Sequence, residues 1–165
     1  ITMVKEKYKF DDVFNLKLPS TRIDTLPISQ IVKEITNVYS QVKPNVIYSP
    51  FINDIHTDHQ IISKALQSTF KWFRYPFINK VLMYETVSET EFNFANQEKF
   101  SPNVFSDISE YIDDKINTMK IYEGEIDEHP FPRSEKTIRS LAALRGSQSG
   151  YIAAEAFQLV YERNK

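Results

Sequence analysis

Cysteine is absent from the 165-residue chain. Disulfides and thiolate metal sites are therefore excluded, and this composition fits a reducing compartment, so we predict a cytoplasmic protein. The sequence also has no run approaching the ~20 apolar residues of a membrane span. Its charged first residues, Ile1–Lys7, lack the long apolar core of a signal peptide. These absences predict a protein with no membrane span.

An excess of charge of one sign is also missing. The formal net charge is -2 and no basic run stands out, which argues against nucleic acid and against a membrane surface as partners. Hydrophobic residues make up 41% of the chain and charged residues 25%, the ordinary composition of a globular protein. At this length we expect one domain over residues 1–165.

Aromatic residues are abundant at 13%, and five of them fall within Phe70–Phe77. Such a cluster is typical of a core or of a contact between subunits more than of a ligand platform. Association into a homo-oligomer is therefore one expectation.

The first half of the chain predicts a strand, a helix and a second strand. Val13–Leu18 has the composition of a strand and is followed by a proline. From Ser29 to Val42 the apolar residues recur at helical spacing, with Pro27 as a start signal. Val46–Ser49 is the next apolar run. Strand, helix and strand in this order form a βαβ unit with parallel strands.

The remaining elements are predicted from apolar spacing and cap residues. They are a helix over residues 61–70, a strand over 80–85, a long loop over 86–103, a helix over 108–119 capped by Ser106, and a helix from Ser134 that ends at Gly146. Residues 153–161 fit either an edge strand or a terminal helix. The sum is an α/β sandwich with a mostly parallel sheet.

Two of the three histidines, His56 and His59, lie with Asp58 in the short stretch Asp54–Gln60. Imidazole and carboxylate groups bind zinc and related divalent metals. Because a predicted strand ends just before this stretch, it lies at the edge of the sheet where ligands bind. One imidazole on a metal that activates water, with a second that stabilises an oxyanion, would make a hydrolytic pair. Asp58 could orient an imidazole, accept a proton or bind metal. A polar helix cap with two solvated histidines is the alternative that spacing alone favours.

Four further residues are weaker candidates. Asp54 and Glu85, at the same edge of the sheet, and Arg145, at a helix end, are candidates for substrate binding. For Glu85 and Arg145 the alternatives are a solvated glutamate and an arginine that interacts with the helix macrodipole. His129, in an acidic segment with two prolines, is expected at the surface, with a third metal ligand as the second interpretation.

Several short motifs follow one another along the chain. They are Lys43–Pro50 followed by Asp54–Gln60, then Tyr84–Thr86, Phe100–Asn103, Pro130–Ser134, Arg145–Gln148 and Ala154–Phe157. In this order they resemble the LmbE/PIG-L family of metal-dependent N-acetylglucosaminyl deacetylases, over nearly the whole chain. The resemblance implies a three-layer α/β/α sandwich with a mostly parallel, Rossmann-like sheet.

The resemblance also implies roles for the matching residues. His59 would be a ligand of zinc or another divalent metal, His56 would stabilise the tetrahedral oxyanion, and Asp58 would tune the catalytic partner. The reaction would be hydrolysis of the N-acetyl group of a small amino-sugar conjugate, with a carboxylate as general base.

One family motif has no counterpart in this sequence. The family begins with a strand that ends in Ala-His-Pro-Asp-Asp-Glu, which supplies two more metal ligands and the general base, and no such stretch occurs here. One histidine does not make the three-ligand site that catalytic zinc normally uses. The first residue is also not methionine. We therefore expect that an N-terminal strand, helix and strand of the domain are missing from this chain, and that the chain alone is inactive.

Two other functions fit the same residues. A non-catalytic carbohydrate-binding or scaffold domain on this fold would bind N-acetylated sugars without turnover. A hydrolase of another bond, such as a phosphoester, is the third hypothesis, because a fold and a partial metal site do not specify a reaction.

Overall fold

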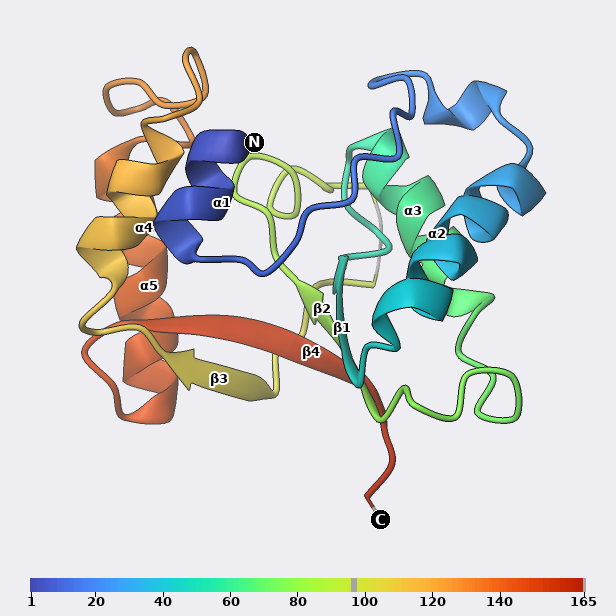
Figure 1. Ribbon diagram of the computed structural model, residues 1–165. Helices are drawn as coiled ribbons and strands as arrows, with labels where there is room; N and C mark the ends of the chain where they lie inside the picture. Colours follow the sequence, from blue (N-terminus) through green and yellow to red (C-terminus); the bar gives the residue numbers. More distant parts are fainter. Residues whose placement is uncertain (96–97, 165) are drawn as a thin grey trace. The chain divides into compact units, whose positions relative to one another are not determined.

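The computed structural model describes residues 1–95 and 98–164 of the chain (Figure 1). These residues contain five α-helices, one 3-10 helix and four strands, joined by loops. In chain order the elements are α1 (Thr2–Tyr8), η1 (Ile23–Thr25), α2 (Ile28–Val42), β1 (Val46–Pro50), α3 (Thr57–Gln67), β2 (Lys80–Tyr84), β3 (Val104–Asp107), α4 (Ile112–Met119), α5 (Glu135–Ser149) and β4 (Ala154–Glu162). This mixed α/β architecture confirms the predicted fold class.

The chain divides into two compact units. Unit 1 comprises Ile1–Asn15 and Phe105–Ala156, and unit 2 comprises Leu16–Val104 and Phe157–Lys165. Unit 1 therefore holds α1, α4 and α5, and unit 2 holds η1, α2, α3, β1 and β2. The strands follow the hydrogen-bonded order β1-β2-β4-β3, and β4 contributes residues to both units.

The sheet of unit 2 is mixed rather than mostly parallel. β1 pairs parallel with β2, with Pro50 opposite Tyr84 at the carboxyl ends of the two strands. β2 pairs antiparallel with β4, with a register shift between Val81 and Leu82. The parallel arrangement predicted for this sheet is therefore found between β1 and β2, and β4 departs from it.

The core of unit 2 lies between this sheet and two helices. Ile31, Ile35 and Tyr39 follow each other at four-residue spacing along α2 and are buried, as the helical pattern predicts. α3 lies beside α2 (Figure 1) and contributes Ala65 and Leu66 to the same cluster of buried residues. On the other side of α3, the Ser63 hydroxyl lies 3.3 Å from that of Ser49 on β1, and both side chains are fully buried. Helix α3 is therefore fixed against both the strand and the neighbouring helix.

Two local predictions are wrong. Val13–Leu18 belongs to no strand in the described part of the chain, and Lys17 within it has φ 52°. Leu16 and Leu18 instead pack against the core of unit 2. Alternating apolar residues determine which side chains are buried, but strand pairing also requires a neighbouring strand edge. Ser106 lies within β3, and Tyr111 rather than Ser106 is the N-cap of α4.

Gly146 does not end its helix as predicted. α5 begins at the predicted cap, where the Ser134 hydroxyl accepts a hydrogen bond from the Thr137 N–H at 3.2 Å, and continues to Ser149. Gly150, with φ 82°, provides the left-handed residue that ends it. Gly146 has a different function, because the backbone of Tyr151 and Ile152 returns against it. A Cβ at Gly146 would lie 2.5 Å from the Tyr151 carbonyl oxygen and 2.9 Å from the Ile152 carbonyl carbon.

Gly146→Ala is therefore expected to destabilise unit 1 by about 2 kcal/mol, because backbone atoms cannot move aside as a flexible side chain can. Urea unfolding followed by circular dichroism measures this free energy. Ser140→Ala, at an exposed position of the same helix, is the matched control and should change it by less than about 0.5 kcal/mol. Equal stability of the two variants would show that the chain after α5 moves away without cost.

No helix among the described residues is long and apolar enough to cross a membrane, in agreement with the sequence prediction.

Candidate active site

The candidate site lies where the parallel strands β1 and β2 end. The loop after β1 carries Asp54 and His56 and leads directly into α3, which begins at Thr57. The loop after β2 reaches the same place, because the Ile55 N–H donates to the Glu89 carbonyl at 3.2 Å. The carboxyl ends of adjacent parallel strands thus bring two loops together, as is usual for ligand sites in α/β proteins.

Asp54 is fully buried at the centre of these loops. One carboxylate oxygen, Oδ2, lies 2.8 Å from His59 Nδ1. The other, Oδ1, accepts a hydrogen bond from the Thr90 hydroxyl at 2.6 Å. The Asp54 backbone carbonyl accepts a further bond from the Gln60 side chain at 2.7 Å. Both carboxylate oxygens are therefore held by protein groups, and the carboxylate orients an imidazole.

His59 lies in the first turn of α3 and is only partly exposed, with 28% of its side chain accessible. The hydrogen bond that His59 donates to the Asp54 carboxylate raises the pKa of His59 above its ordinary value of 6.5, and this effect outweighs burial, which lowers the pKa. The negative charges of Glu89 and Asp58 raise this pKa further. Since Nδ1 donates to the carboxylate, the neutral ring carries its lone pair on Nε2, the arrangement typical of metal-binding histidines.

His56 has the opposite arrangement. It is the N-cap of α3, and its Nδ1 accepts a hydrogen bond from the Asp58 N–H at 3.1 Å. Because Nδ1 accepts, the proton of the neutral ring is on Nε2, and that nitrogen is a donor. The rings of His56 and His59 stack with centroids 4.9 Å apart and planes inclined by 19°. The two stacked rings therefore present a lone pair on His59 Nε2 and an N–H donor on His56 Nε2.

The Asp58 carboxylate faces away from both imidazoles. It accepts hydrogen bonds from the backbone N–H groups of Thr21, at 2.6 Å, and Ile23, at 3.2 Å. Thr21 has φ 61°, a left-handed conformation that threonine rarely adopts. Asp58 thus fastens the segment before α2 to the first turn of α3, and only its backbone N–H contacts His56.

The other two predicted substrate-binding residues lie in different units. Glu85 directly follows β2, at the edge where Asp54 lies, and is partly buried. Arg145 is on α5 in unit 1, where its guanidinium donates to the Gln148 side chain at 3.0 Å.

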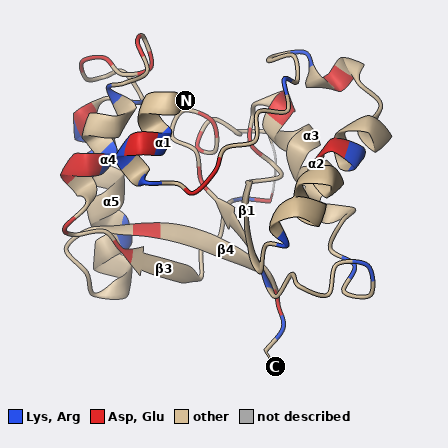
Figure 2. Cartoon of the chain, in the orientation of Figure 1, with Lys and Arg blue, Asp and Glu red and all other residues tan. Residues whose placement is uncertain are grey.

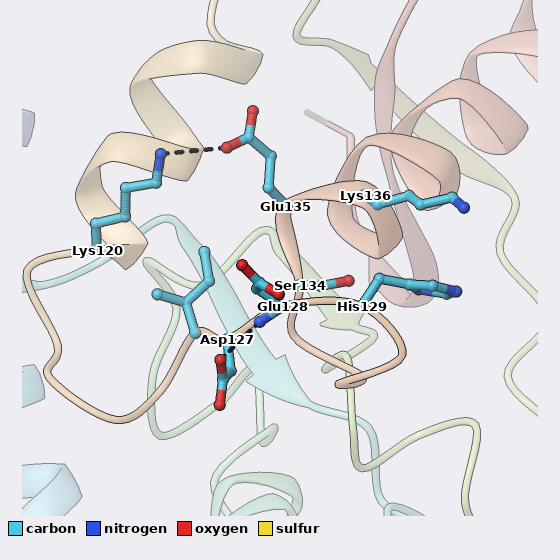
Figure 3. Close-up of a pocket in the computed structure, with 8 residues that line it drawn as sticks. Lys120, Asp127, Glu128, His129, Ser134, Glu135 and Lys136 are labelled. Carbon is cyan, nitrogen blue, oxygen red and sulfur yellow. Dashed lines mark hydrogen bonds and ion pairs between the residues drawn. The ribbon is translucent and has the colours of Figure 1, made fainter.

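His129 is exposed, as expected, and lines an open depression of about 520 Å³ in unit 1 (Figure 3). Its neighbours there carry charges of both signs, and Glu135 is paired with Lys120 at 3.1 Å. Within residues 1–95 and 98–164, no three histidine, aspartate or glutamate side chains converge so that they could hold a metal ion. The second interpretation of His129, a third metal ligand, therefore finds no support from its surroundings.

Sequence reasoning missed Thr90 and Tyr84. The Thr90 hydroxyl donates a hydrogen bond to Asp54 Oδ1 and also accepts one from the Thr86 N–H at 2.8 Å. Tyr84, at the end of β2, is close enough for the Asp54 charge to raise its pKa, after the larger effect of burial. Tyr84 begins the Tyr84–Thr86 motif, but no role was predicted for its side chain. For Thr90 the only sequence signal was the length of the loop that contains it.

Comparison with known proteins finds a family model and solved structures that are similar to this chain. The PIG-L family model, described as GlcNAc-PI de-N-acetylase, matches residues 2–70, a range that contains Asp54, His56 and His59. Over these residues the chain is similar to the PIG-L family. The match ends close to the end of α3.

Two solved structures share the fold of this chain. The conserved protein TT1542 from Thermus thermophilus is 16% identical, with a TM-score of 0.70 over 99% of this chain and 72% of that chain. The N,N′-diacetylchitobiose deacetylase from Pyrococcus horikoshii is 14% identical, with a TM-score of 0.70 over 96% of this chain and 61% of that chain. This chain thus spans less than two thirds of the Pyrococcus deacetylase. At these identities the comparison establishes the fold.

Asp54→Asn is expected to lower the pKa of His59 towards its ordinary value, because the charged acceptor becomes neutral at nearly constant shape. Because the pKa of His59 is raised on folding, protonation of His59 stabilises the folded state. This contribution is fully present below the unfolded-state pKa of 6.5 and is lost as the pH rises through the folded-state pKa. The variant should therefore lose more stability in mildly acidic than in alkaline solution. NMR titration of the imidazole resonances, with His129 as internal control, together with urea unfolding at both pH values, measures the two effects. An unchanged His59 titration would contradict the assignment.

Proposed function

We propose that this chain carries the histidine pair of a hydrolase that removes the N-acetyl group from an N-acetylglucosamine-type conjugate. The observation that carries the proposal is the stacked pair His56 and His59, with its lone pair and N–H donor at the carboxyl end of β1. The family description, GlcNAc-PI de-N-acetylase, and the diacetylchitobiose deacetylase with the same fold both support a deacetylase.

Zinc or another divalent metal is the proposed cofactor, and His59 Nε2 its ligand in this chain. His59 fits this role, because a buried carboxylate on Nδ1 is the usual support of a metal-binding histidine. The described residues do not supply the further donors of a three-ligand site. When bound, such a metal polarises the amide carbonyl and lowers the pKa of water.

The residues of this chain would act around the scissile amide. The His56 Nε2–H would donate to the oxygen of the former carbonyl as negative charge develops there. Water adds to the carbonyl carbon, the C–N bond breaks, and acetate and a free amine are released. Asp54 would keep the His59 ring oriented, and Asp58 would hold the first turn of α3 that carries both histidines. Glu85, in the same unit as the histidines, is proposed to contact the sugar, and the role of Arg145 remains a prediction from the sequence.

A non-catalytic carbohydrate-binding domain is the second candidate. The observation that favours it is the lack of three converging metal donors among residues 1–95 and 98–164. In this function the same histidines would bind an N-acetylated sugar through hydrogen bonds without turnover.

Incubation of the protein with N-acetylglucosaminyl conjugates and zinc, followed by NMR detection of acetate, separates the candidates. The deacetylase proposal predicts acetate and free amine in equal amounts. Saturation-transfer NMR signals from the sugar without acetate would indicate the binding domain. Turnover of p-nitrophenyl phosphate in place of the amide would indicate a phosphoesterase.

A further inference from the structure

Two large aromatic side chains project from the turn that follows α3. Trp72 and Phe73 are 62% and 64% exposed, and their rings are 6.0 Å apart and nearly perpendicular. Lys71 and Arg74, which flank them, are also exposed. We call Lys71–Arg74 the Trp72 loop. Exposure of adjacent Trp and Phe side chains is unfavourable in water unless a partner covers them.

The outward position of these rings is fixed by the residues on either side. Phe70, Tyr75 and Phe77 pack against the core of unit 2, and the rings of Tyr75 and Phe77 lie 5.6 Å and 6.4 Å from that of Tyr39. The Tyr75 N–H also donates to the Lys71 carbonyl at 3.0 Å, which closes the turn. The aromatic cluster predicted as core or subunit contact is therefore divided into three partly buried residues that pack on the core and two exposed rings.

The surroundings of the Trp72 loop are positively charged. Residues 60–84 contain four lysines and arginines and no aspartate or glutamate, although the whole chain has a net charge of -2; one of the four, Lys80, is paired with Glu162 at 2.6 Å. Figure 2 shows blue and no red on this loop. Within the described part of the chain, no salt bridge involves Lys64, Lys71 or Arg74. The net charge of the whole chain argued against a membrane surface, but it does not reveal this local excess of positive charge.

We propose that the Trp72 loop docks unit 2 onto an anionic lipid surface. Tryptophan favours the boundary between headgroups and acyl chains, where its apolar ring and polar N–H are both satisfied. Flanking cations add attraction to anionic headgroups. A self-associating protein face would not need unpaired cations beside the aromatic residues, since like charges on the two copies would repel. This inference is independent of the proposed hydrolase, because the loop follows the C-terminal end of α3 and the histidines lie at the other end.

Trp72 is the only tryptophan of the chain, so its fluorescence reports on this loop alone. Titration with vesicles of phosphatidylcholine containing about one third phosphatidylserine should shift its emission to shorter wavelength, and brominated lipid should quench it. Vesicles of pure phosphatidylcholine should bind at least about tenfold more weakly. Salt that reduces the Debye length from ~10 Å to ~3 Å should weaken binding to the anionic vesicles.

Charge-matched variants test the residues. Lys71→Glu/Arg74→Glu should weaken vesicle binding at least about tenfold, and Phe73→Ser should weaken it similarly through lost apolar contact. Lys33→Glu/Lys136→Glu, with the same change in net charge at exposed positions, should leave binding unchanged. Equal losses in both double variants would overturn the proposal. So would a blue shift that depends on protein concentration without vesicles, which would indicate a contact between copies of the chain.

Discussion

Replacement of His59 by alanine is expected to lower acetate release by more than the roughly 10- to 100-fold loss typical of a residue that only supports a metal ligand. The reason is that His59 Nε2 is the proposed ligand itself, while Asp54 contacts the other ring nitrogen at 2.8 Å. Asp54→Asn should therefore fall within that roughly 10- to 100-fold range. The initial rate of acetate release from an N-acetylglucosaminyl conjugate measures both variants.

Two further variants make this comparison specific. His56→Ala should cost about 10²- to 10³-fold, mostly in kcat, because its Nε2–H is proposed to act on charge that develops in the transition state. His129→Ala, an exposed histidine of unit 1, should leave the rate unchanged. Equal rates for His59→Ala and His129→Ala would remove the histidine pair from the mechanism.

Asp58→Ala is expected to reduce the stability of unit 2 by about 3 kcal/mol, because two backbone N–H groups lose a charged acceptor in a buried position. Those groups belong to Thr21 and Ile23, 2.6 Å and 3.2 Å from the carboxylate, and the Asp58 residue is only 7% exposed. Urea unfolding followed by the fluorescence of Trp72, which lies in the same unit, measures this loss.

The matched control is Asp24→Ala. Asp24 is an exposed aspartate of η1 in the same segment, and its loss should change the free energy of unfolding by less than about 0.5 kcal/mol. A fully stable Asp58→Ala protein whose acetate release has an altered pH dependence would instead support the family role of Asp58 in tuning His56.

The elements that the sequence predicted well are those with strong local signals. α2 and β1 form almost at the expected residues, because helical spacing and a short apolar run between breakers are local properties. α3 begins four residues earlier than expected, at Thr57 rather than Ile61, since His56 rather than an apolar residue caps it. β3 was missed because Val104–Asp107 has no alternation long enough to distinguish it from a loop. Strand pairing depends on distant partners, which explains the error at Val13–Leu18.

For the candidate site, the sequence indicated which residues to consider but not their hydrogen bonds, and their roles stay predictions. His56 and His59 were chosen for their chemistry and spacing, and both lie at the edge of the sheet as expected. Their opposite proton positions could not be predicted, because they depend on which group meets each Nδ1. For His59 that group is Asp54, which is itself held by Thr90, 36 residues away. For His56 it is a backbone N–H, which no sequence pattern specifies.

The most direct test of the account is the zinc content of the protein and of two histidine variants after loading and desalting, by inductively coupled plasma mass spectrometry. Because the described residues supply one proposed ligand rather than three, the account predicts less than one zinc per chain in the unmodified protein and in His129→Ala, and less again in His59→Ala. Equal zinc retention in all three proteins, or none in the unmodified protein, would contradict the assignment of His59 as a metal ligand.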